Sequence, residues 1–505
     1  MEPILIETAN YNYLYHTNPE LNHVILVHPL IKIIYNTINK FDITKEQALN
    51  SLLQNPTYTT VFTKQEIDYY SNKYLFLEKY GFFDTYNTDE LFDTKLNNEQ
   101  IIQNIANNEL LIIETTEDCN LRCEYCGYGK YYANNSPTRD KKYQTFENVK
   151  VLLDFLKNKR NDVLNTSILP ELHIGFYGGE PLLNVNLIKK TVNYAIAIFD
   201  KVKFSMTTNG LLLAKHIEFL IENNFVVLIS LDGNEHNNSY RINKNNKNSF
   251  ADNIKNLNYV YTNYPDYFNT NIRFNSVIHN RNSVSDAYWF IKNNFKTNKV
   301  SFAGLNTIDI ANEYKDEFKQ MYNNVYQSFI NSPDSQELTN ELFIDSPIIN
   351  ELNNFVEYMS GNYFTNFFQF LTNKMDNILP TGTCSPFERR LFFTVEGKIF
   401  ICERIGQKFC YGALDDNKIE INVENVVDFY NKVFSTLSPV CKCCYKIFSC
   451  SCCLYELVTD KDFKKLSCKY FQNKQQYANY LKENIEILEK QPELYNILMT
   501  NVIVK

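Results

Sequence analysis

The middle of this 505-residue chain alternates between strand-like and helix-like segments, and this alternation restricts the fold more than any other feature. Apolar and β-branched runs predict strands, and apolar residues at helical spacing predict the helices that follow them. Expected strands cover 110–116, 171–177, 201–208, 225–231, 270–278 and 299–305. Expected helices cover 145–159, 184–199, 211–223, 249–262, 283–294 and 312–330. Repeated strand–helix units require a parallel sheet with right-handed crossovers, so an α/β fold with a partial (β/α)6 TIM-like barrel is predicted.

Three cysteines follow the first expected strand. Cys119, Cys123 and Cys126 are separated by three and then two residues and lie in a loop. Three thiolates at this spacing can hold three corners of a cubane iron–sulfur cluster and leave one iron without a protein ligand. An open iron can bind a small molecule, which indicates chemistry rather than electron storage. Zinc is the alternative, but zinc sites usually show paired Cys-x-x-Cys units or nearby histidines, and none of the seven histidines lies in this loop.

Short polar and glycine-containing segments follow the next three expected strands. They are Tyr177-Gly-Gly-Glu-Pro, Thr207-Thr-Asn-Gly and Ser230-Leu-Asp-Gly, with Arg241 a short way beyond the last. Paired glycines let backbone approach a ligand closely, and Glu180 can accept a hydrogen bond from an ammonium group. Each segment alone is an ordinary tight turn. Together they predict a site at the carboxyl edge of the barrel.

The cysteine spacing with Tyr125 before the third cysteine, followed in order by GGEP, TNG and SLDG, resembles the radical S-adenosylmethionine (radical SAM) core across about residues 105–310. The resemblance implies a [4Fe-4S] cluster at Cys119, Cys123 and Cys126 that binds SAM. The further implied cofactor contacts are Tyr125, Gly178, Gly179 and Glu180 (the last three at the methionine amino group), Thr208, Asn209 and Ser230 near the ribose and carboxylate, and Arg241 at the carboxylate. The family often has His-Asp before this arginine, whereas this chain has His236-Asn237.

The C-terminal third carries the other ten cysteines, and a hairpin is expected about Glu396-Gly397. The pattern resembles the SPASM extension of radical SAM enzymes, which implies two auxiliary [4Fe-4S] clusters. Cys441, Cys444, Cys450 and Cys468 are the implied ligands of one. Cys384, Cys402 and Cys453 are the implied ligands of the other, with Cys410 as a possible fourth. The choice between Cys452 and Cys453 stays open, as does the role of Cys410, and zinc ribbons are the alternative.

The first 98 residues predict three short strands, 4–8, 11–16 and 23–27, followed by three helices and an extended wing after Gly81. Thr44 and Thr63 each precede a glutamine or glutamate at the reciprocal capping position. This layout resembles the winged-helix-like peptide-recognition domain fused to enzymes that modify ribosomally made peptides. Strand addition at a sheet edge is the expected mode of binding, and a purely structural extension is the alternative.

Charge and composition exclude several classes of function. The net charge of −8 gives no basic footprint for nucleic acid. No apolar run approaches a membrane span, and the N-terminus lacks the features of a secretory signal. A cytoplasmic location is therefore expected. Thirteen cysteines in a cytoplasmic protein indicate metal or redox chemistry rather than disulfides.

These patterns predict five regions: a leader-recognition domain (1–98), the radical SAM barrel (99–335), a helical bridge (336–380), the SPASM domain (381–475) and a C-terminal helix (476–505). The resemblance implies a maturase that installs a thioether, carbon–carbon or carbon–oxygen crosslink in a precursor peptide with a leader, supplied with electrons by a flavodoxin or ferredoxin. The alternatives are a formylglycine-generating enzyme like the anaerobic sulfatase maturases, and a non-catalytic zinc-stabilised binding protein. No spacing singles out a general base, and no catalytic residue is assigned beyond the cluster that binds SAM.

Overall fold

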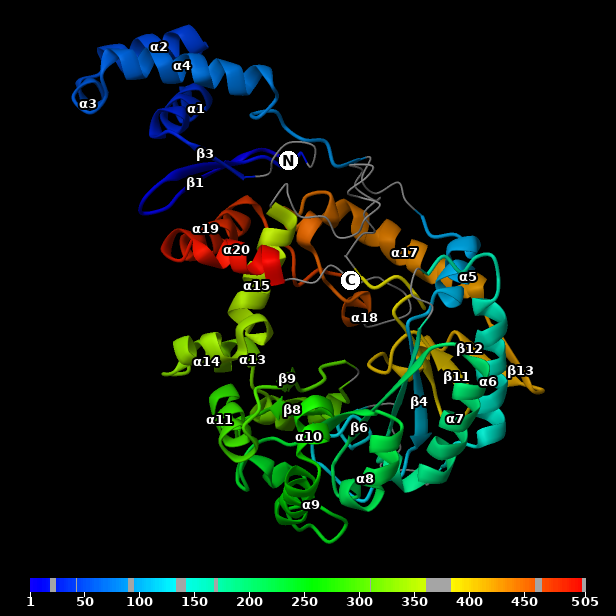
Figure 1. Ribbon diagram of the computed structural model, residues 1–505. Coiled ribbons are helices and arrows are strands. Elements are labelled where there is room, and N and C mark those ends of the chain that lie inside the picture. Colours follow the sequence, from blue (N-terminus) through cyan, green and yellow to red (C-terminus); the bar gives the residue numbers. More distant parts are fainter. Residues whose placement is uncertain are drawn as a thin grey trace.

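The chain is described from a computed structural model (Figure 1). The described residues are 1–18, 24–41, 43–89, 95–132, 142–167, 171–308, 310–359, 383–458 and 466–501. Residues 360–380 of the expected helical bridge lie outside these ranges. Within them, no helix combines the length and the apolar character needed to cross a membrane.

The predicted parallel sheet is confirmed. Its six parallel strands lie in chain order and are β4 (Leu110–Thr116), β5 (Leu172–Gly178), β6 (Val202–Thr208), β7 (Val226–Ser230), β8 (Ile272–Ile278) and β9 (Val300–Gly304). Alternate side chains such as Ile174, Val227 and Phe274 are fully buried in the main core. Because all six strands run the same way, their carboxyl ends meet at one edge, and the cysteine loop begins there.

The crossover helices pack on the strands in the expected order (Figure 1). They are α6 (Phe146–Arg160), the 3-10 turn η2 (Pro181–Asn184), α7 (Val185–Ile198), α8 (Leu213–Glu222), η3 (Asn237–Tyr240), α9 (Phe250–Asn263), α10 (Pro265–Asn271) and α11 (Val284–Phe295). The sequence prediction did not include α10. Proline at its first position fits a helix start, because proline has no N–H to leave unbonded there.

The helix expected over 312–330 is in fact interrupted. The elements there and beyond are η4 (Asn312–Tyr314), α12 (Lys315–Met321), α13 (Val325–Ile330), α14 (Ser335–Leu342), η5 (Phe343–Asp345) and α15 (Pro347–Met359). Tyr322 adopts an extended backbone and bridges to His279, and Asn324 then caps α13 by accepting from Gln327 N–H. Asparagine caps compete with a continuous helix, so the apolar spacing alone overestimated the helix length.

Four further strands extend the sheet beyond β4: β10 (Arg390–Phe393), β11 (Lys398–Phe400), β12 (Gly412–Asp415) and β13 (Lys418–Ile421). β10 pairs with β4 in parallel, with Arg390 opposite Leu110, and then forms the expected hairpin with β11. Gly397 has φ +76° in its turn, a conformation that favours glycine. Residues of this region belong to the same hydrophobic core as the barrel, so the cysteine-rich third is fused to the barrel rather than packed as a separate core.

The N-terminal region contains a separate antiparallel sheet followed by helices. Its elements are β1 (Ile4–Glu7), β2 (Asn12–Tyr15), β3 (Val24–Val27), α1 (Pro29–Phe41), α2 (Lys45–Gln54), α3 (Pro56–Thr59) and α4 (Lys64–Lys79). The next helix, α5 (Asn98–Ala106), packs in the main core with the barrel instead. Both predicted capping boxes, at Thr44 and Thr63, are present. The expected extended wing is not: residues 81–84 form a turn, and no strand follows α4 in residues 85–89. The apolar pair Phe82-Phe83 instead packs against the core of the helices.

The remaining helices lie in the C-terminal third of the chain, and the last two contact the N-terminal sheet. They are η7 (Gln407–Phe409), α17 (Val423–Cys441), η8 (Ile447–Ser449), α18 (Leu454–Leu457), α19 (Lys474–Lys490) and α20 (Glu493–Asn501). Figure 1 shows α19 and α20 beside β1, and a shared core joins Tyr15 of the N-terminal sheet to Tyr477 and Leu481 of α19. Thr8, Asn10 and Tyr13 all donate hydrogen bonds to Glu489, at 2.6–2.9 Å.

Candidate functional site

The cysteine loop lies at the carboxyl end of β4 and is held by a second loop that follows β7. Arg122 N–H donates to Ile242 O at 2.6 Å, and Glu124 N–H donates to Tyr240 O at 3.0 Å. The Cys119 side chain is buried, and those of Cys123 and Cys126 are half-buried. Burial raises the pKa of Cys123 to about 12; Arg241 opposes this, and the thiols of Cys126 and Cys119 add to it. The three thiols therefore lie near enough to interact electrostatically.

The glycine pair of GGEP lets β5 approach the cysteine loop. Gly179 N–H donates to Thr116 O at 2.7 Å, and Glu180 N–H donates to Asp118 O at 2.9 Å. A Cβ atom on Gly178 would lie 2.3 Å from Thr116 O, and one on Gly179 would lie 2.1 Å from Asp118 O. Gly178 also has φ +130°. The glycines therefore admit the backbone of the cysteine loop, and their predicted contact with a ligand stays a prediction.

Glu180 is fully buried and braces the end of β6. Its carboxylate accepts from Leu182 N–H at 3.1 Å, Thr208 Oγ1 at 2.7 Å and Asn209 N–H at 2.9 Å. Burial raises its pKa, although these hydrogen bonds favour the charged form. A carboxylate can accept about four hydrogen bonds, and groups of the chain itself donate three of them to Glu180. The predicted contact of this segment with the methionine amino group stays a prediction.

Asn209 and Ser230 lie at the ends of the next two strands. The Asn209 side chain turns toward the cysteine loop, where Nδ2 lies 2.7 Å from Asn120 Oδ1 and 3.7 Å from Cys119 Sγ. Ser230 ends β7 opposite Asn275 of β8. The structure thus brings the predicted residues of β5, β6 and β7 to one edge together with the cysteines. Their contacts with the ribose and carboxylate of SAM stay predictions.

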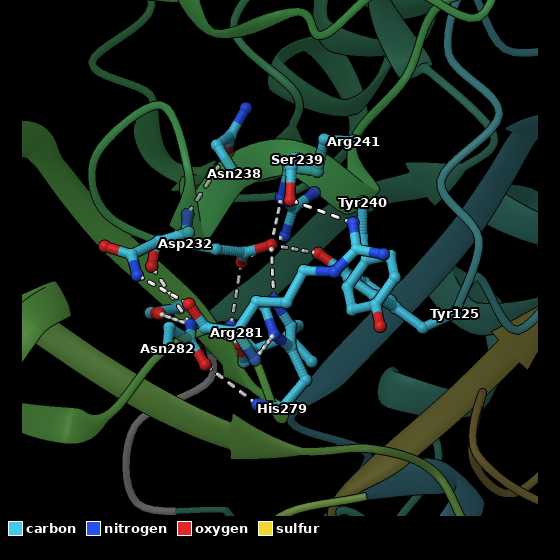
Figure 2. Close-up of polar contacts among 12 residues, drawn as sticks. Tyr125, Asp232, Asn238, Ser239, Tyr240, Arg241, His279, Arg281 and Asn282 are labelled. Carbon is cyan, nitrogen blue, oxygen red and sulfur yellow. Dashed lines mark hydrogen bonds and ion pairs between the residues drawn. The ribbon is translucent and has the colours of Figure 1, made fainter. Parts of the chain in front are cut away.

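A buried carboxylate that the sequence prediction gave no role organises the other side of the loop. Figure 2 shows Asp232 surrounded by donors from three segments. Arg241 donates from Nε and from its terminal nitrogen, both at 2.9 Å, and Val277 N–H donates at 3.0 Å. The hydroxyl of Tyr125 also donates to it. Arg241 was predicted to pair with the carboxylate of SAM; in the structure it forms a two-pronged ion pair with Asp232.

Charge neutralisation explains how Asp232 can be buried. Burial alone would raise the pKa of Asp232, but Arg241 and hydrogen bonds outweigh it and lower the pKa to about 2. Only its place in SLDG signalled this residue in the sequence.

His279 and Asn282 complete the network from the end of β8 (Figure 2). His279 Nδ1 accepts from Arg281 N–H at 3.1 Å, so a neutral ring carries its proton on Nε2. That nitrogen lies 3.6 Å from Asp232 Oδ2, longer than an ordinary hydrogen bond. Asn282 donates to Asp232 O at 3.0 Å. Neither residue was predicted, because no spacing distinguishes one buried histidine or asparagine from another.

Comparison with known proteins agrees with this geometry. Residues 113–274 match the radical SAM superfamily. This segment is a radical SAM domain. It contains the cysteine loop, the GGEP, TNG and SLDG segments, and Arg241. The cysteine loop and the strand ends described above lie within or beside this matched segment, and their cofactor contacts stay predictions.

Three relatives align with the radical SAM domain or beyond it. An uncharacterized protein from Methanocaldococcus jannaschii is 36% identical over 157 residues, 30% of this chain and 49% of that protein. Radical SAM cyclopropyl synthase TigE from Paramaledivibacter caminithermalis is 23% identical over 429 residues, 80% of this chain and 81% of that protein. A cysteine-type anaerobic sulfatase-maturating enzyme from Clostridium novyi is 33% identical over 162 residues, 30% of this chain and 40% of that protein. The chain thus spans about half the length of the first relative.

A solved structure shares the fold. Native anSMEcpe with bound AdoMet and a Cp18Cys peptide superposes with a TM-score of 0.50 at 19% identity, covering 78% of this chain and 99% of that one. This likeness supports the fold, in which the matched segment forms most of the barrel.

The donor set of the radical SAM domain fits an iron–sulfur cluster. All thirteen cysteines lie in the described ranges and are thiols rather than disulfides. Two N–H groups, from Leu121 at 3.4 Å and Asn209 at 3.7 Å, point at Cys119 Sγ, as they would at a thiolate. In the described part of the chain, no group of three or more Cys, His, Asp or Glu side chains that could hold a metal ion is found.

The C-terminal cysteines fall into two groups beside the radical SAM domain. Burial raises the pKa of Cys450, and the nearby thiols of Cys444 and Cys468 add to it. Burial also raises the pKa of Cys452, with further contributions from Cys450 and Cys468. Cys450, Cys452 and Cys453 all line one cavity of about 520 Å³, so the choice between Cys452 and Cys453 stays open.

The second predicted group contains Cys384, Cys402 and Cys453, with Cys410 as a possible member. Burial raises the pKa of Cys453, with a smaller contribution from Cys384. Burial raises the pKa of Cys402 to about 12. Cys410 donates to Gly412 O at 3.2 Å and lines a separate cavity of about 630 Å³. The ligand sets of both auxiliary clusters, including the place of Cys410 and Cys441, stay predictions.

Proposed function

We propose that this chain is a radical SAM peptide maturase. The observation that carries the proposal is the three-cysteine loop, braced by the GGEP segment and by Asp232 at the carboxyl edge of the barrel. When bound, a [4Fe-4S] cluster supplies the electron that cleaves SAM to a 5′-deoxyadenosyl radical, which takes a hydrogen atom from the substrate. The barrel positions SAM and the peptide and excludes water.

Different residues of the chain have separate roles in this reaction. Cys119, Cys123 and Cys126 hold three irons and leave the fourth for SAM. Arg241 uses two of its five N–H donors on Asp232, so its other donors are the ones available to the carboxylate of SAM. The two C-terminal cysteine groups would hold auxiliary [4Fe-4S] clusters that take the electron left after bond formation. A flavodoxin or ferredoxin in the cytoplasm would supply the reducing electron.

A crosslinking reaction is favoured over formylglycine formation by the extent of similarity. The cyclopropyl synthase TigE aligns with 80% of this chain, including regions outside the radical SAM domain. Closing a cyclopropyl ring requires a new carbon–carbon bond. The sulfatase-maturating relatives are more identical, at 31–33%, but align with 28–30% of the chain. Because of these relatives, formylglycine formation is the second candidate function.

The N-terminal sheet offers an edge for a leader peptide. β1 lies against α19, whereas β3 pairs only with β2 among the described residues. The Leu26 side chain in β3 is 62% exposed. His28, directly after β3, stacks on Tyr70 of α4 with ring centroids 3.7 Å apart, so this helix flanks the same edge. An extended leader would add to β3 through backbone hydrogen bonds and place apolar side chains beside α4.

The cluster and SAM cleavage are tested together. The chain is purified without oxygen and reconstituted, and iron, sulfide and 5′-deoxyadenosine are measured for wild type and for the Cys119/Cys123/Cys126→Ala variant. We expect about twelve irons in the wild type, a loss of about four in the variant, and loss of SAM cleavage. Zinc in place of iron, with no SAM cleavage, would favour the non-catalytic zinc protein. Cleavage unchanged in the variant would overturn the role of these three cysteines.

The peptide substrate is tested with synthetic peptides encoded by short reading frames beside the gene, and with a cysteine-containing sulfatase peptide. Leader binding is followed by fluorescence anisotropy, with Leu26→Lys as the variant and Val163→Lys, at a 94% exposed site after α6, as the control. We expect Leu26→Lys to weaken binding at least tenfold and the control to bind as wild type does. Formylglycine on the sulfatase peptide, with no crosslink on the others, would select the second candidate.

A further inference from the structure

Asn209 holds its side chain against a cysteine that the cluster needs. This residue is 7% exposed and follows β6. Its Nδ2 lies 3.7 Å from Cys119 Sγ and 2.7 Å from Asn120 Oδ1. One amide group therefore contacts both the first cysteine and the residue after it.

The direction of this amide is fixed by its neighbours. Asn209 Oδ1 accepts from Leu211 N–H at 3.0 Å, a donor that a nitrogen in the same place would oppose. The NH2 group must therefore face Cys119. The turn itself is held from both sides: Asn209 N–H donates to Glu180 at 2.9 Å, and Asn253 Nδ2 donates to Asn209 O at 2.6 Å. The side chain is thus oriented before any cofactor binds.

Hydrogen bonds to cluster sulfurs change the reduction potential. A reduced cluster carries more negative charge on its sulfurs, so an N–H donor stabilises the reduced state more than the oxidised state and raises the potential. Cys119 Sγ already receives the backbone N–H of Leu121 at 3.4 Å. The donor from Asn209 is the part of this environment that a side-chain substitution can remove.

We propose that Asn209 is a positioning residue that donates a hydrogen bond to the Cys119 thiolate and raises the reduction potential of the cluster that binds SAM. This role is separate from the ribose and carboxylate contact expected from the sequence, which stays a prediction. It gives Glu180 a second task, because Glu180 holds the turn that aims this amide. The inference rests on the proposed function to the extent that Cys119 binds iron.

The test measures the potential rather than activity. Redox titration followed by electron paramagnetic resonance is done on the anaerobically reconstituted full chain. The signal of interest is the one absent from the Cys119/Cys123/Cys126→Ala variant and shifted by SAM. Asn209→Asp keeps the acceptor for Leu211 and removes the donor, and Asn209→Leu removes both. We expect both variants to shift the midpoint to more negative values, with the larger shift in Asn209→Asp because it adds a negative charge.

Asn253→Ala is the matched control, because it loosens the same turn without touching the sulfur. We expect its midpoint to shift less than in either Asn209 variant, because the amide donor of Asn209 is still present. An equal shift in Asn253→Ala, or no shift in either Asn209 variant that retains iron, overturns the inference and leaves the proposed function standing. A wild-type chain that binds no iron at Cys119 overturns both.

A measurement on the wild type keeps the test decisive if the variants do not fold. With ¹⁵N-labelled asparagine, pulsed resonance of the reduced cluster reports nitrogen nuclei within a few bonds of its sulfurs. We expect a weak ¹⁵N coupling in the labelled protein that is replaced by a ¹⁴N coupling when asparagine is unlabelled. Its absence from labelled protein would show that no asparagine amide bonds to the cluster.

Discussion

At the scale of single residues, Asp232 determines how the cysteine loop is held. Its side chain is fully buried and binds Arg241 through two hydrogen bonds of 2.9 Å. Asp232→Asn leaves the Arg241 charge buried without its partner, so we expect a loss of about 3–5 kcal/mol in the free energy of unfolding. Denaturant unfolding of the apo chain measures this. Asp316→Asn, whose partner Lys319 lies 3.9 Å away at an exposed site, should change stability by about 0.5 kcal/mol or less.

The same residue predicts a pH dependence. The pKa of Asp232 is about 2 in the folded chain and about 3.9 when unfolded, so its charge stabilises the fold fully above about pH 4. This contribution is lost as the pH falls through about 2, because the folded carboxylate then takes up a proton. We therefore expect the stability difference between wild type and Asp232→Asn to shrink between pH 5 and pH 2. A difference that stays constant over this range would contradict the ion-pair explanation.

At the scale of elements, the end of β5 and the cysteine loop pack without space for a side chain. A Cβ on Gly179 would lie 2.1 Å from Asp118 O, whereas one on Gly127, in the same loop, meets nothing within 4 Å. We expect Gly179→Ala to displace the loop and to cost more than about 2 kcal/mol, while Gly127→Ala stays within about 0.5 kcal/mol. Unfolding midpoints and the iron retained after reconstitution measure the two effects. Equal iron retention in both variants would argue against close packing as the role of the glycine.

Element boundaries also show what the sequence could and could not predict. The six barrel strands and the capping boxes at Thr44 and Thr63 were predicted because they depend on local spacing, and β4 matches its expected range. The strands β12 and β13 were not predicted. The break between α12 and α13 depends on a bridge from Tyr322 to His279, a contact distant in sequence. The pairing of Arg241 with Asp232 was missed for the same reason: the motif placed both residues at the edge but not the direction of either side chain.

At the scale of the whole molecule, the sequence could not predict how its two ends meet. The N-terminal sheet was expected as an independent module, yet β1 shares a core with α15, α19 and α20, and Glu489 accepts three hydrogen bonds from residues 8–13. No local pattern links segments more than 470 residues apart. The consequence is that C-terminal helices fix the position of the proposed leader edge relative to the barrel.

This arrangement predicts that a substitution in α19 impairs peptide modification far more than SAM cleavage. Leu481 of α19 is fully buried in the core shared with β1, so Leu481→Ala should cost about 2–5 kcal/mol locally. We expect faster amide hydrogen exchange in β1 and β2 and unchanged exchange in β4 to β9. Leu220→Ala, in α8 of the barrel core, should give the opposite pattern. Because the leader edge would lose its fixed position while the cysteine loop stays intact, Leu481→Ala should impair peptide modification far more than SAM cleavage without peptide. Unchanged exchange in β1 would mean that α19 does not anchor the sheet, and the coupling of leader position to the barrel would have to lie elsewhere.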